Sequence, residues 1–291
     1  MSSIENKSIK RVTVRDLQRM KGSGEKIVAL TASDFSFARL FDRSGVDLIL
    51  VGDSLAMVSL GHENTLSVTL DEMLHHCKAV ARGSCKSFLV GDMPFLSYQI
   101  NVADAVKNAG RFLSEAGMNG VKLEGGLMIV NTVEAIVRAG IPVMGHIGLM
   151  PQYVNQIGGY IVQGNDISKA NSLLEDALAL EKAGCFALVL ESIPQQLGHY
   201  ITDKLSIPTI GIGSGVYCDG QVLVGYDLLG LFEEFKPKFV KRYGNLSSQI
   251  IKAVEQYSGE VKDSSFPTKN YSHMMSPDEF KSFLDAKNDQ L

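Results

Sequence analysis

The chain has 291 residues, of which 45% are hydrophobic and 21% are charged, a composition that is typical of globular proteins and excludes wholesale disorder. Its 32 acidic residues outnumber its 28 lysines and arginines, and at a net charge of −4 it lacks the basic surplus expected of a nucleic-acid-binding protein. At this length the chain can form one large α/β barrel with extensions or two ordinary domains.

We expect neither a secretory signal nor a membrane span. The N-terminal stretch MSSIENKSIKRV has no apolar core segment, and no uncharged apolar run reaches the ~18 residues that a span needs. The cysteines form neither a CxxC pair nor a zinc spacing; they are Cys77, Cys85, Cys185 and Cys218. Free thiols in a reducing cytosol are therefore expected, with a cytoplasmic location and no nucleic-acid or membrane partner.

Short apolar runs recur along the chain after a predicted short helix at residues 13–21, which we expect to cover the floor of the fold. Runs with little polar alternation are typical of strands that are covered on both faces, as in a parallel sheet. The predicted strands are residues 26–31, 47–52, 87–91, 120–123, 141–145, 186–190, 207–212 and 221–224.

The segments between these runs predict helices. In residues 101–116, apolar side chains recur every three or four positions and form one face. Residues 69–81 begin with Thr69 and carry Glu72 three positions later, which predicts a capping box. Residues 168–183 precede Gly184, at the position of a helix stop. Eight alternating strand and helix units favour a closed (β/α)8 barrel over an open doubly wound sheet.

The pattern breaks after the eighth run. Residues 228–256 predict further helix, interrupted by a Lys-Pro-Lys sequence, and residues 259–275 are polar and irregular. We therefore expect one barrel domain with its terminal helices over residues 1–258. Residues 259–291 are expected to form a C-terminal tail that docks on a neighbouring surface.

The tail carries the start signals of one short helix. Ser276 is a candidate N-cap, Pro277 suits the first helical position, and Glu279 can complete a capping box. The apolar face of this predicted helix consists of Phe280, Phe283 and Leu284.

Ionisable side chains lie at the ends of five successive predicted strands, where the active site of a (β/α)8 barrel is built. Four carboxylates beside one lysine are unbalanced, and burying them without a counter-ion would cost several kcal/mol per ion. Oxygen ligands with only one nearby histidine point to magnesium or manganese rather than zinc. These residues are Asp53, Asp92, Lys122, Glu124, His146 and Glu191.

Each of these residues also has a structural interpretation. A single aspartate at a strand end is commonly the N-cap of the next helix, and His146 can be a hydrogen-bonded core histidine. Asp53 and Asp92 lie in near-identical Gly-Asp phrases on adjacent strands, which makes two independent caps less favoured. The glycines of residues 211–215 either form a phosphate-binding turn or let the backbone approach a substrate.

Long phrases of the sequence resemble ketopantoate hydroxymethyltransferase. The similarity runs in order from about residue 12 to about residue 256. It is carried by DLILVGDSLAM at 47–57, GDMPF at 91–95, VKLEGG at 121–126, GHIGLMPQ at 145–152, GGYIVQG at 158–164, LVLESIP at 188–194 and IGIGSGVYCDGQVLV at 210–224.

The resemblance implies a magnesium-dependent barrel of the phosphoenolpyruvate/pyruvate type. Such an enzyme transfers a one-carbon unit from 5,10-methylenetetrahydrofolate to 3-methyl-2-oxobutanoate and forms 2-dehydropantoate, in pantothenate biosynthesis. It further implies that Asp53 and Asp92 hold one Mg²⁺ per subunit and face the substrate, and that Glu124 contributes through water. Family members often form decamers, so we expect a homo-oligomer of that size.

The resemblance also implies roles for residues around the metal. Ser54, Lys122 and His146 would contact the 2-oxo acid, and Glu191 would accept a proton. A 2-oxo acid can chelate a metal through its carboxylate and keto oxygens, and the metal then stabilises the enolate formed when C3 loses a proton. No residue is assigned to folate.

Some positions depart from the family pattern. Ser33 replaces a tyrosine after the first strand, and Ile161 and Asn165 replace two basic residues. Met150 and Tyr226 replace a threonine and a histidine. Two other functions therefore stay open. One is a magnesium-dependent 2-oxo-acid carbon–carbon lyase that needs no folate, and the other is a non-catalytic ligand-binding or assembly protein.

Overall fold

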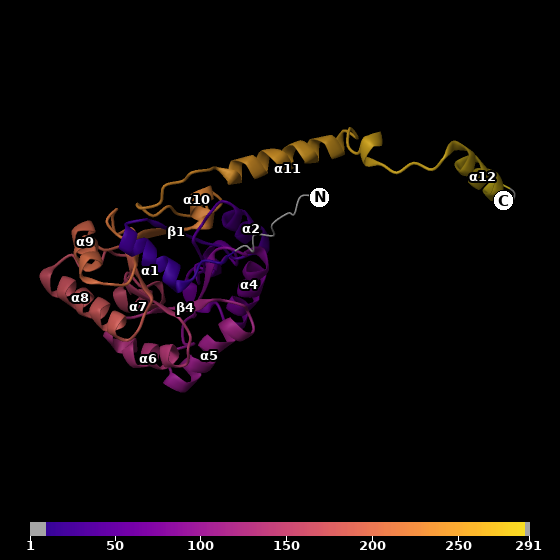
Figure 1. Cartoon of the computed structure of the whole chain (residues 1–291). Coiled ribbons are helices and arrows are strands. Elements are labelled where there is room, and N and C mark those ends of the chain that lie inside the picture. Colours follow the sequence, from indigo (N-terminus) through magenta and orange to yellow (C-terminus); the bar gives the residue numbers. More distant parts are fainter. Residues whose placement is uncertain (1–9, 289–291) are drawn as a thin grey trace, which may run out of the picture. The chain divides into compact units, whose positions relative to one another are not determined.

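Eight parallel strands follow one another in chain order and close into a barrel in which β8 pairs with β1 (Figure 1). The computed structural model describes residues 10–288. Each predicted run overlaps one strand, so the predicted (β/α)8 barrel is confirmed. The strands are β1 Ile27–Thr31, β2 Leu48–Val51, β3 Phe88–Asp92, β4 Gly120–Glu124, β5 Val143–Gly148, β6 Ala187–Glu191, β7 Thr209–Ile212 and β8 Gly220–Val224.

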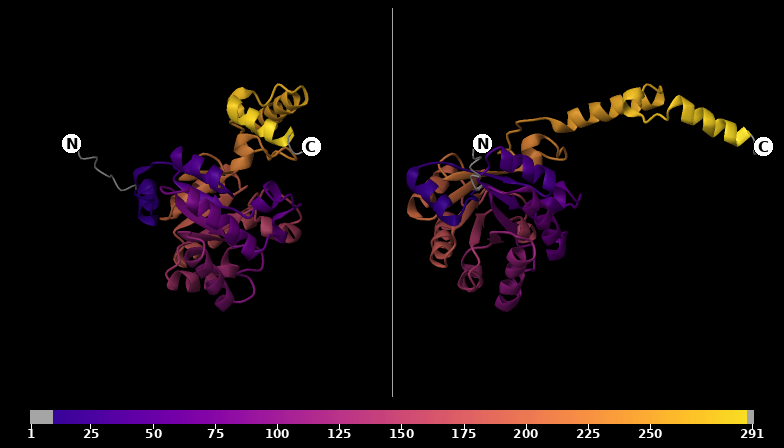
Figure 2. Two further views of the ribbon diagram at one scale, coloured as in Figure 1. Left: turned by 90° about the vertical axis from the view of Figure 1, so that its right-hand side faces the viewer. Right: turned by 45° about the vertical axis from the view of Figure 1, so that its right-hand side comes forward.

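Helices surround the strands on the outside of the barrel (Figures 1 and 2). Their apolar faces are buried, as Ala105, Ala109 and Phe112 of α5 illustrate. The longer helices are α2 Phe35–Arg43, α4 Leu70–Gly83, α5 Val102–Ser114, α6 Val130–Arg138, α8 Ile167–Lys182 and α9 Gln195–Lys204. The short ones are α3 Leu55–Val58, η1 Thr65–Ser67, η2 Leu127–Ile129, η3 Pro151–Tyr153, α7 Val154–Ile157 and α10 Gly225–Leu229.

Local sequence signals fix the ends of these helices. The capping box of α4 is confirmed. The backbone N–H of Glu72 donates to Thr69 Oγ1 at 3.3 Å, and the backbone N–H of Thr69 donates to Glu72 Oε2 at 2.7 Å. Helix α8 starts slightly earlier than predicted, because Asp166 caps it by accepting from the Lys169 N–H at 2.9 Å. Gly184 takes the left-handed conformation after α8, with φ 98°.

Helix α1, Val14–Ser23, closes the end of the barrel where the strands begin. It buries Leu17 and Met20 in a cluster that also holds the first residues of three strands, Ile27, Leu48 and Phe88. The helix predicted to cover the floor of the fold is therefore confirmed. The opposite end of the barrel, where the strands finish, is left for a site.

The chain after β8 differs from the prediction. Between β8 and residue 262 the helices are α10 and α11, Leu246–Lys262. The helix predicted over residues 228–256, with its interruption at Lys-Pro-Lys, is therefore wrong for the segment between α10 and α11. Gly230 ends α10 in the left-handed conformation, with φ 67°, and Pro237 cannot donate a helical hydrogen bond. Helix α11 also extends into the stretch that was expected to be irregular.

Residues 244–291 group into a unit of their own, which contains α11, η4 Lys269–Tyr271 and α12 Pro277–Asn288 (Figure 2). Ser276 Oγ accepts from the Glu279 N–H at 3.2 Å, which confirms the predicted N-cap. The exposed rings of Phe280 and Phe283 stack 6.3 Å apart. Both the domain division at residue 258, which lies within α11, and the docking of the tail stay predictions.

No described helix is long and apolar enough to cross a membrane. The expectation of no secretory signal rests mostly on residues 1–9, which lie outside the described residues.

Candidate active site

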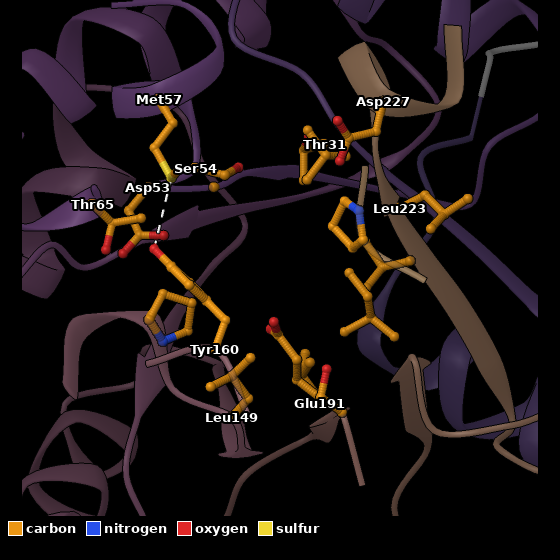
Figure 3. A pocket seen from close by; sticks show the side chains of 18 of the residues that line it. Thr31, Asp53, Ser54, Met57, Thr65, Leu149, Tyr160, Glu191, Leu223 and Asp227 are labelled. Carbon is orange, nitrogen blue, oxygen red and sulfur yellow. Dashed lines mark hydrogen bonds between the residues drawn. The ribbon is translucent and has the colours of Figure 1, made fainter. Parts of the chain in front are cut away.

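The six ionisable residues predicted at the strand ends come together at one end of the barrel. They line a single cavity of about 410 Å³, together with Ser54 (Figure 3). In β4, Lys122 and Glu124 are two positions apart, so the strand turns both side chains to the same face. Asp92 and Glu191 end their strands, His146 belongs to β5, and Asp53 follows β2.

Lys122 forms ion pairs with two buried carboxylates. Its Nζ lies 3.0 Å from Asp92 Oδ1 and 3.6 Å from Glu124 Oε1. Burial disfavours the charged amine, but the negative charges of Asp92, Glu124 and Asp53 outweigh burial and raise the pKa of Lys122. Lys122 is therefore a cation throughout the neutral pH range.

The carboxylates carry more negative charge than Lys122 can balance. The Asp53 backbone N–H donates to Asp92 Oδ2 at 3.1 Å, which places the two aspartates side by side. Burial raises the pKa of Asp53 well above its usual range, and Asp92 and Glu124 raise it further. Burial also raises the pKa of Asp92, against the effect of Lys122. The pKa of Glu124 is lowered, because Lys122 and His146 outweigh its burial.

This donor set could hold a divalent cation. Buried Asp92 Oδ1 and Glu124 Oε1 share the one ammonium group of Lys122, and burying carboxylates that lack a full counter-charge is costly. All the available donors are oxygens, as Mg²⁺ prefers. Among residues 10–288, no three acidic, histidine or cysteine side chains already form a metal centre. Asp53, Asp92 and Glu124 are the carboxylates of the cluster that could hold a cation.

His146 connects the ion-pair cluster to Glu191. Its Nδ1 lies 3.2 Å from Lys122 Nζ and 3.4 Å from Glu124 Oε1, and its Nε2 lies 3.2 Å from Glu191 Oε2. Burial and Lys122 disfavour the imidazolium, but Glu124 and Glu191 favour it and raise the pKa of His146 to about 9. The side chain of Glu191 is 15% exposed, against 1% for Glu124, so it is the acid most open to the cavity.

Two residues that the sequence analysis did not single out support the cluster. Gln152 donates from Nε2 to Asp53 Oδ2 at 3.0 Å, and its backbone N–H donates to Glu124 Oε2, also at 3.0 Å. The Tyr98 hydroxyl lies 2.9 Å from Gln152 Oε1 and accepts from the Glu124 backbone N–H at 3.1 Å. Gln152 is the last residue of the phrase GHIGLMPQ, so the family resemblance alone could have pointed to it as a site residue. Tyr98 lies in none of the phrases that carry the resemblance.

The alternative that the aspartates are helix caps is not supported. Asp34 does cap α2, accepting from the backbone N–H groups of Ser36 at 2.7 Å and Phe37 at 3.0 Å. No helical N–H in the described part of the chain donates to Asp53 or Asp92. Both belong instead to the cluster around Lys122.

The positions that depart from the family pattern lie outside the main cavity. Ser33 lines a small neighbouring cavity, and its Oγ lies 2.9 Å from Ser59 Oγ. Tyr226 packs against Phe37, with ring centroids 5.3 Å apart. The side chains of Met150, Ile161 and Asn165 do not line the main cavity.

The glycines of residues 211–215 serve packing within the protein. Only Ile212 of this stretch lines the cavity. A Cβ on Gly213 would come within 2.8 Å of the Phe239 ring, and one on Gly215 within 2.3 Å of the Gln195 side chain. Neither a phosphate-binding turn nor a backbone approach to substrate is needed to account for these glycines.

Relatives of this chain share one name. A family model described as ketopantoate hydroxymethyltransferase matches residues 11–269. Proteins named 3-methyl-2-oxobutanoate hydroxymethyltransferase are similar to it. One from Clostridium botulinum (strain Langeland) is 56% identical over 268 residues, covering 92% of this chain and 98% of the relative. One from Clostridium kluyveri is 59% identical (88% and 91% covered), and one from Geobacter sulfurreducens is 55% identical (89% and 97% covered).

Solved structures of similar fold are more distant in sequence. Phosphonopyruvate hydrolase in complex with oxalate and Mg²⁺ has a TM-score of 0.58 at 13% identity, covering 94% of this chain and 98% of the other. 2,3-Dimethylmalate lyase, of the PEP mutase/isocitrate lyase superfamily, has a TM-score of 0.57 at 14% identity, with the same coverage. At these identities the likeness is one of fold alone, a (β/α)8 barrel.

Proposed function

The chain belongs to the ketopantoate hydroxymethyltransferase family, and from that premise we propose that it transfers a hydroxymethyl group from 5,10-methylenetetrahydrofolate to 3-methyl-2-oxobutanoate. The product would be 2-dehydropantoate, an intermediate of pantothenate synthesis. One observation carries the proposal: six ionisable side chains from five strands of a barrel meet in one cavity. Family membership makes the chain a transferase, which leaves the lyase and non-catalytic alternatives without support.

The proposed cofactor is one Mg²⁺ per subunit, held by Asp53 and Asp92 with Glu124 behind them. The unbalanced negative charge of these buried carboxylates, which share one lysine, supports it. When bound, the cation would stabilise the negative charge that develops on the substrate's keto oxygen as C3 loses its proton.

The substrate is a small anion, and the cavity offers it donors next to the carboxylates. Lys122 is held as a cation by its ion pairs, and His146 is favoured as one. The hydroxyl of Ser54 lines the cavity and makes no hydrogen bond with another described residue. Together these groups can bind the carboxylate and keto oxygens of a 2-oxo acid and orient its C3.

Glu191 is the proposed proton acceptor. Its carboxylate lines the cavity outside the cluster around Lys122, and the contact with His146 Nε2 orients it. Water adds its oxygen to the methylene carbon of the folate and its two hydrogens to the two nitrogens. Both carbon–nitrogen bonds break, which releases formaldehyde and tetrahydrofolate. Glu191 removes the proton from C3, the resulting carbanion forms a bond with the formaldehyde carbon, and the new alkoxide takes the proton back from Glu191 as the hydroxyl of the product.

A cytoplasmic homo-oligomer, a decamer as often formed in the family, belongs to the same proposal. It is supported by the family resemblance.

Product analysis tests the proposed reaction. We expect 2-dehydropantoate by mass spectrometry when the chain, Mg²⁺, 3-methyl-2-oxobutanoate and methylenetetrahydrofolate are combined. Omitting the folate or chelating the metal should abolish the product. Cleavage of the oxo acid without folate would contradict the proposal and favour a lyase.

A further inference from the structure

The active-site cavity has a second polar end that the steps above do not use. Asp227 lies in α10, just after β8, and lines this cavity. Figure 3 shows it beside Thr31, across the cavity from Met57 and Tyr160. Asp227 is only 8% exposed, so its carboxylate is withdrawn from bulk solvent.

Across residues 10–288, the carboxylate oxygens of Asp227 take part in no hydrogen bond and in no ion pair shorter than 4 Å. Burial raises the pKa of Asp227, with an opposing effect of Arg242. Asp227 lies in the first turn of α10, but it neither caps that helix through a hydrogen bond nor forms an ion pair with Arg242. Its carboxylate faces the cavity, so donors on a ligand can take the place of the water that otherwise hydrates it.

Between the two polar ends the cavity wall is mostly apolar, although Ser192 and Lys238 also line the cavity. Val189, Ile212 and Val222 line it on the barrel side. The segment that follows Asp227 in the chain adds three aromatic side chains to the same cavity, Phe232, Phe235 and Phe239. A ligand that fills this space needs a flat, weakly polar body and a hydrogen-bond donor edge that faces Asp227.

We infer that Asp227 recognises the pyrimidine edge of the folate co-substrate, an inference that rests on the proposed function. The N3–H and 2-amino groups of the pterin ring are neighbouring donors, and a carboxylate presents two acceptor oxygens to match them. The aromatic side chains would contact the ring faces. With the ring anchored at Asp227, the methylene group extends toward the end of the cavity where Glu191 lies.

This assignment explains how folate can bind although two basic positions of the family pattern are Ile161 and Asn165 here. The pyrimidine edge is a donor of hydrogen bonds without a negative charge, so its recognition needs an acceptor and no cation. Asp227 would thus determine which one-carbon donor the enzyme accepts, while the residues around Lys122 determine the acceptor.

Binding of tetrahydrofolate, which lacks the reactive methylene group, tests the inference in the full-length chain. We measure binding by calorimetry with Mg²⁺ and 3-methyl-2-oxobutanoate present. Asp227→Asn should bind tetrahydrofolate about ten- to hundredfold more weakly than wild type, because the asparagine NH₂ group would face the N–H donors of the pterin instead of an acceptor oxygen. The matched control is Asp203→Asn, the same change at a side chain that is 65% exposed in α9, and it should bind as wild type does. Unchanged binding by Asp227→Asn would overturn the inference.

A second comparison uses the wild-type chain alone and holds even if the variant does not fold. Wild type should bind tetrahydrofolate at least about tenfold more tightly than its 2-desamino analogue, which lacks one donor. Equal affinity for the two ligands would overturn the role of Asp227. Exchange of the C3 hydrogen of 3-methyl-2-oxobutanoate needs no folate and reports the proposed function separately. If wild type exchanges the C3 hydrogen but binds tetrahydrofolate and the 2-desamino analogue equally well, only the proposed role of Asp227 is rejected. If wild type neither exchanges this hydrogen nor binds tetrahydrofolate, both the proposed function and the role of Asp227 are rejected.

Discussion

Lys122 is the residue on which the charge balance of the site depends. It lies within ion-pair distance of Asp92 and Glu124, and all three side chains are at most 5% exposed. A buried charge that loses its partner destabilises a protein by about 3–5 kcal/mol, far more than the loss of a surface pair. The stability of the apoprotein should therefore depend on this one amine.

Replacing Lys122 with methionine keeps the length of the side chain and removes its charge. We expect Lys122→Met to lower the free energy of unfolding by about 3–5 kcal/mol in chelator, because Asp92 and Glu124 are left without a counter-charge. Urea unfolding measures this. Lys78→Met, which removes a partly exposed lysine 3.8 Å from Glu115, is the control and should cost no more than about 1 kcal/mol. Equal stability of Lys122→Met and wild type would contradict the account.

Gln152 acts on the proposed metal ligands without being one of them. Its side chain donates to Asp53 and its backbone to Glu124, so it holds both carboxylates in place. Losing such an outer contact typically weakens metal binding about 10- to 100-fold. Gln152→Ala should show this loss for Mg²⁺ in calorimetry, whereas Gln256→Ala on the exposed face of α11 should bind as wild type does. Identical Mg²⁺ affinity in Gln152→Ala would reject the positioning role.

Among the elements, α2 and the start of β3 are joined through Asp42. Its Oδ1 accepts from Ser84 Oγ at 2.7 Å and from the backbone N–H groups of Lys86 and Ser87, both at 2.8 Å. Burial disfavours this charge, but the hydrogen bonds outweigh burial and hold the pKa of Asp42 far below its usual range. The ionised form therefore binds α2 to the segment that leads into β3.

This junction predicts a pH dependence of stability. A carboxylate with a lowered pKa in the folded state stabilises the protein above its unfolded pKa of about 4, and this contribution is lost as the pH falls below that value. Asp42→Asn should therefore cost about 2 kcal/mol or more in urea unfolding at pH 7, and the gap to wild type should narrow in acid. Asp71→Asn, at a side chain that is 82% exposed, should change little at either pH. A gap that does not narrow in acid would refute the role of Asp42.

Elements that depend on local chemistry could be predicted from the sequence. The strands are marked by short apolar runs, and the start of α4 by Thr69 and Glu72, whose contacts span only three residues. The segment between α10 and α11 could not be predicted, because Phe232, Phe235 and Phe239 have helix-like spacing but line the cavity. Their positions follow from tertiary packing, which overrides local preference.

The candidate site divides in the same way. Asp53, Asp92 and Glu191 could be predicted because a barrel brings the ends of its strands together. The supporting residues could not, because their partners are remote in the chain: Gln152 and Asp53 are 99 positions apart. Asp227 could not be singled out either, because its place in the cavity depends on how α10 and the following segment pack.

At the scale of the whole molecule, the barrel brings residues that are far apart in the sequence to one cavity. Helix α1 closes the floor, and the strand ends supply donors, carboxylates and Glu191 around that cavity. We propose that a 2-oxo acid bound there loses its C3 proton and forms the enolate before any folate takes part.

The most direct test is deuterium exchange at C3 of 3-methyl-2-oxobutanoate, followed by proton NMR in deuterated water with Mg²⁺ and no folate. Wild type should exchange this hydrogen, and so should Glu134→Gln, an exposed control in α6. Glu191→Gln should exchange it about 10²- to 10⁴-fold more slowly, as expected for a lost general base, while still binding Mg²⁺. Exchange by Glu191→Gln at the wild-type rate would reject Glu191 as the base, and no exchange by wild type would contradict the central claim.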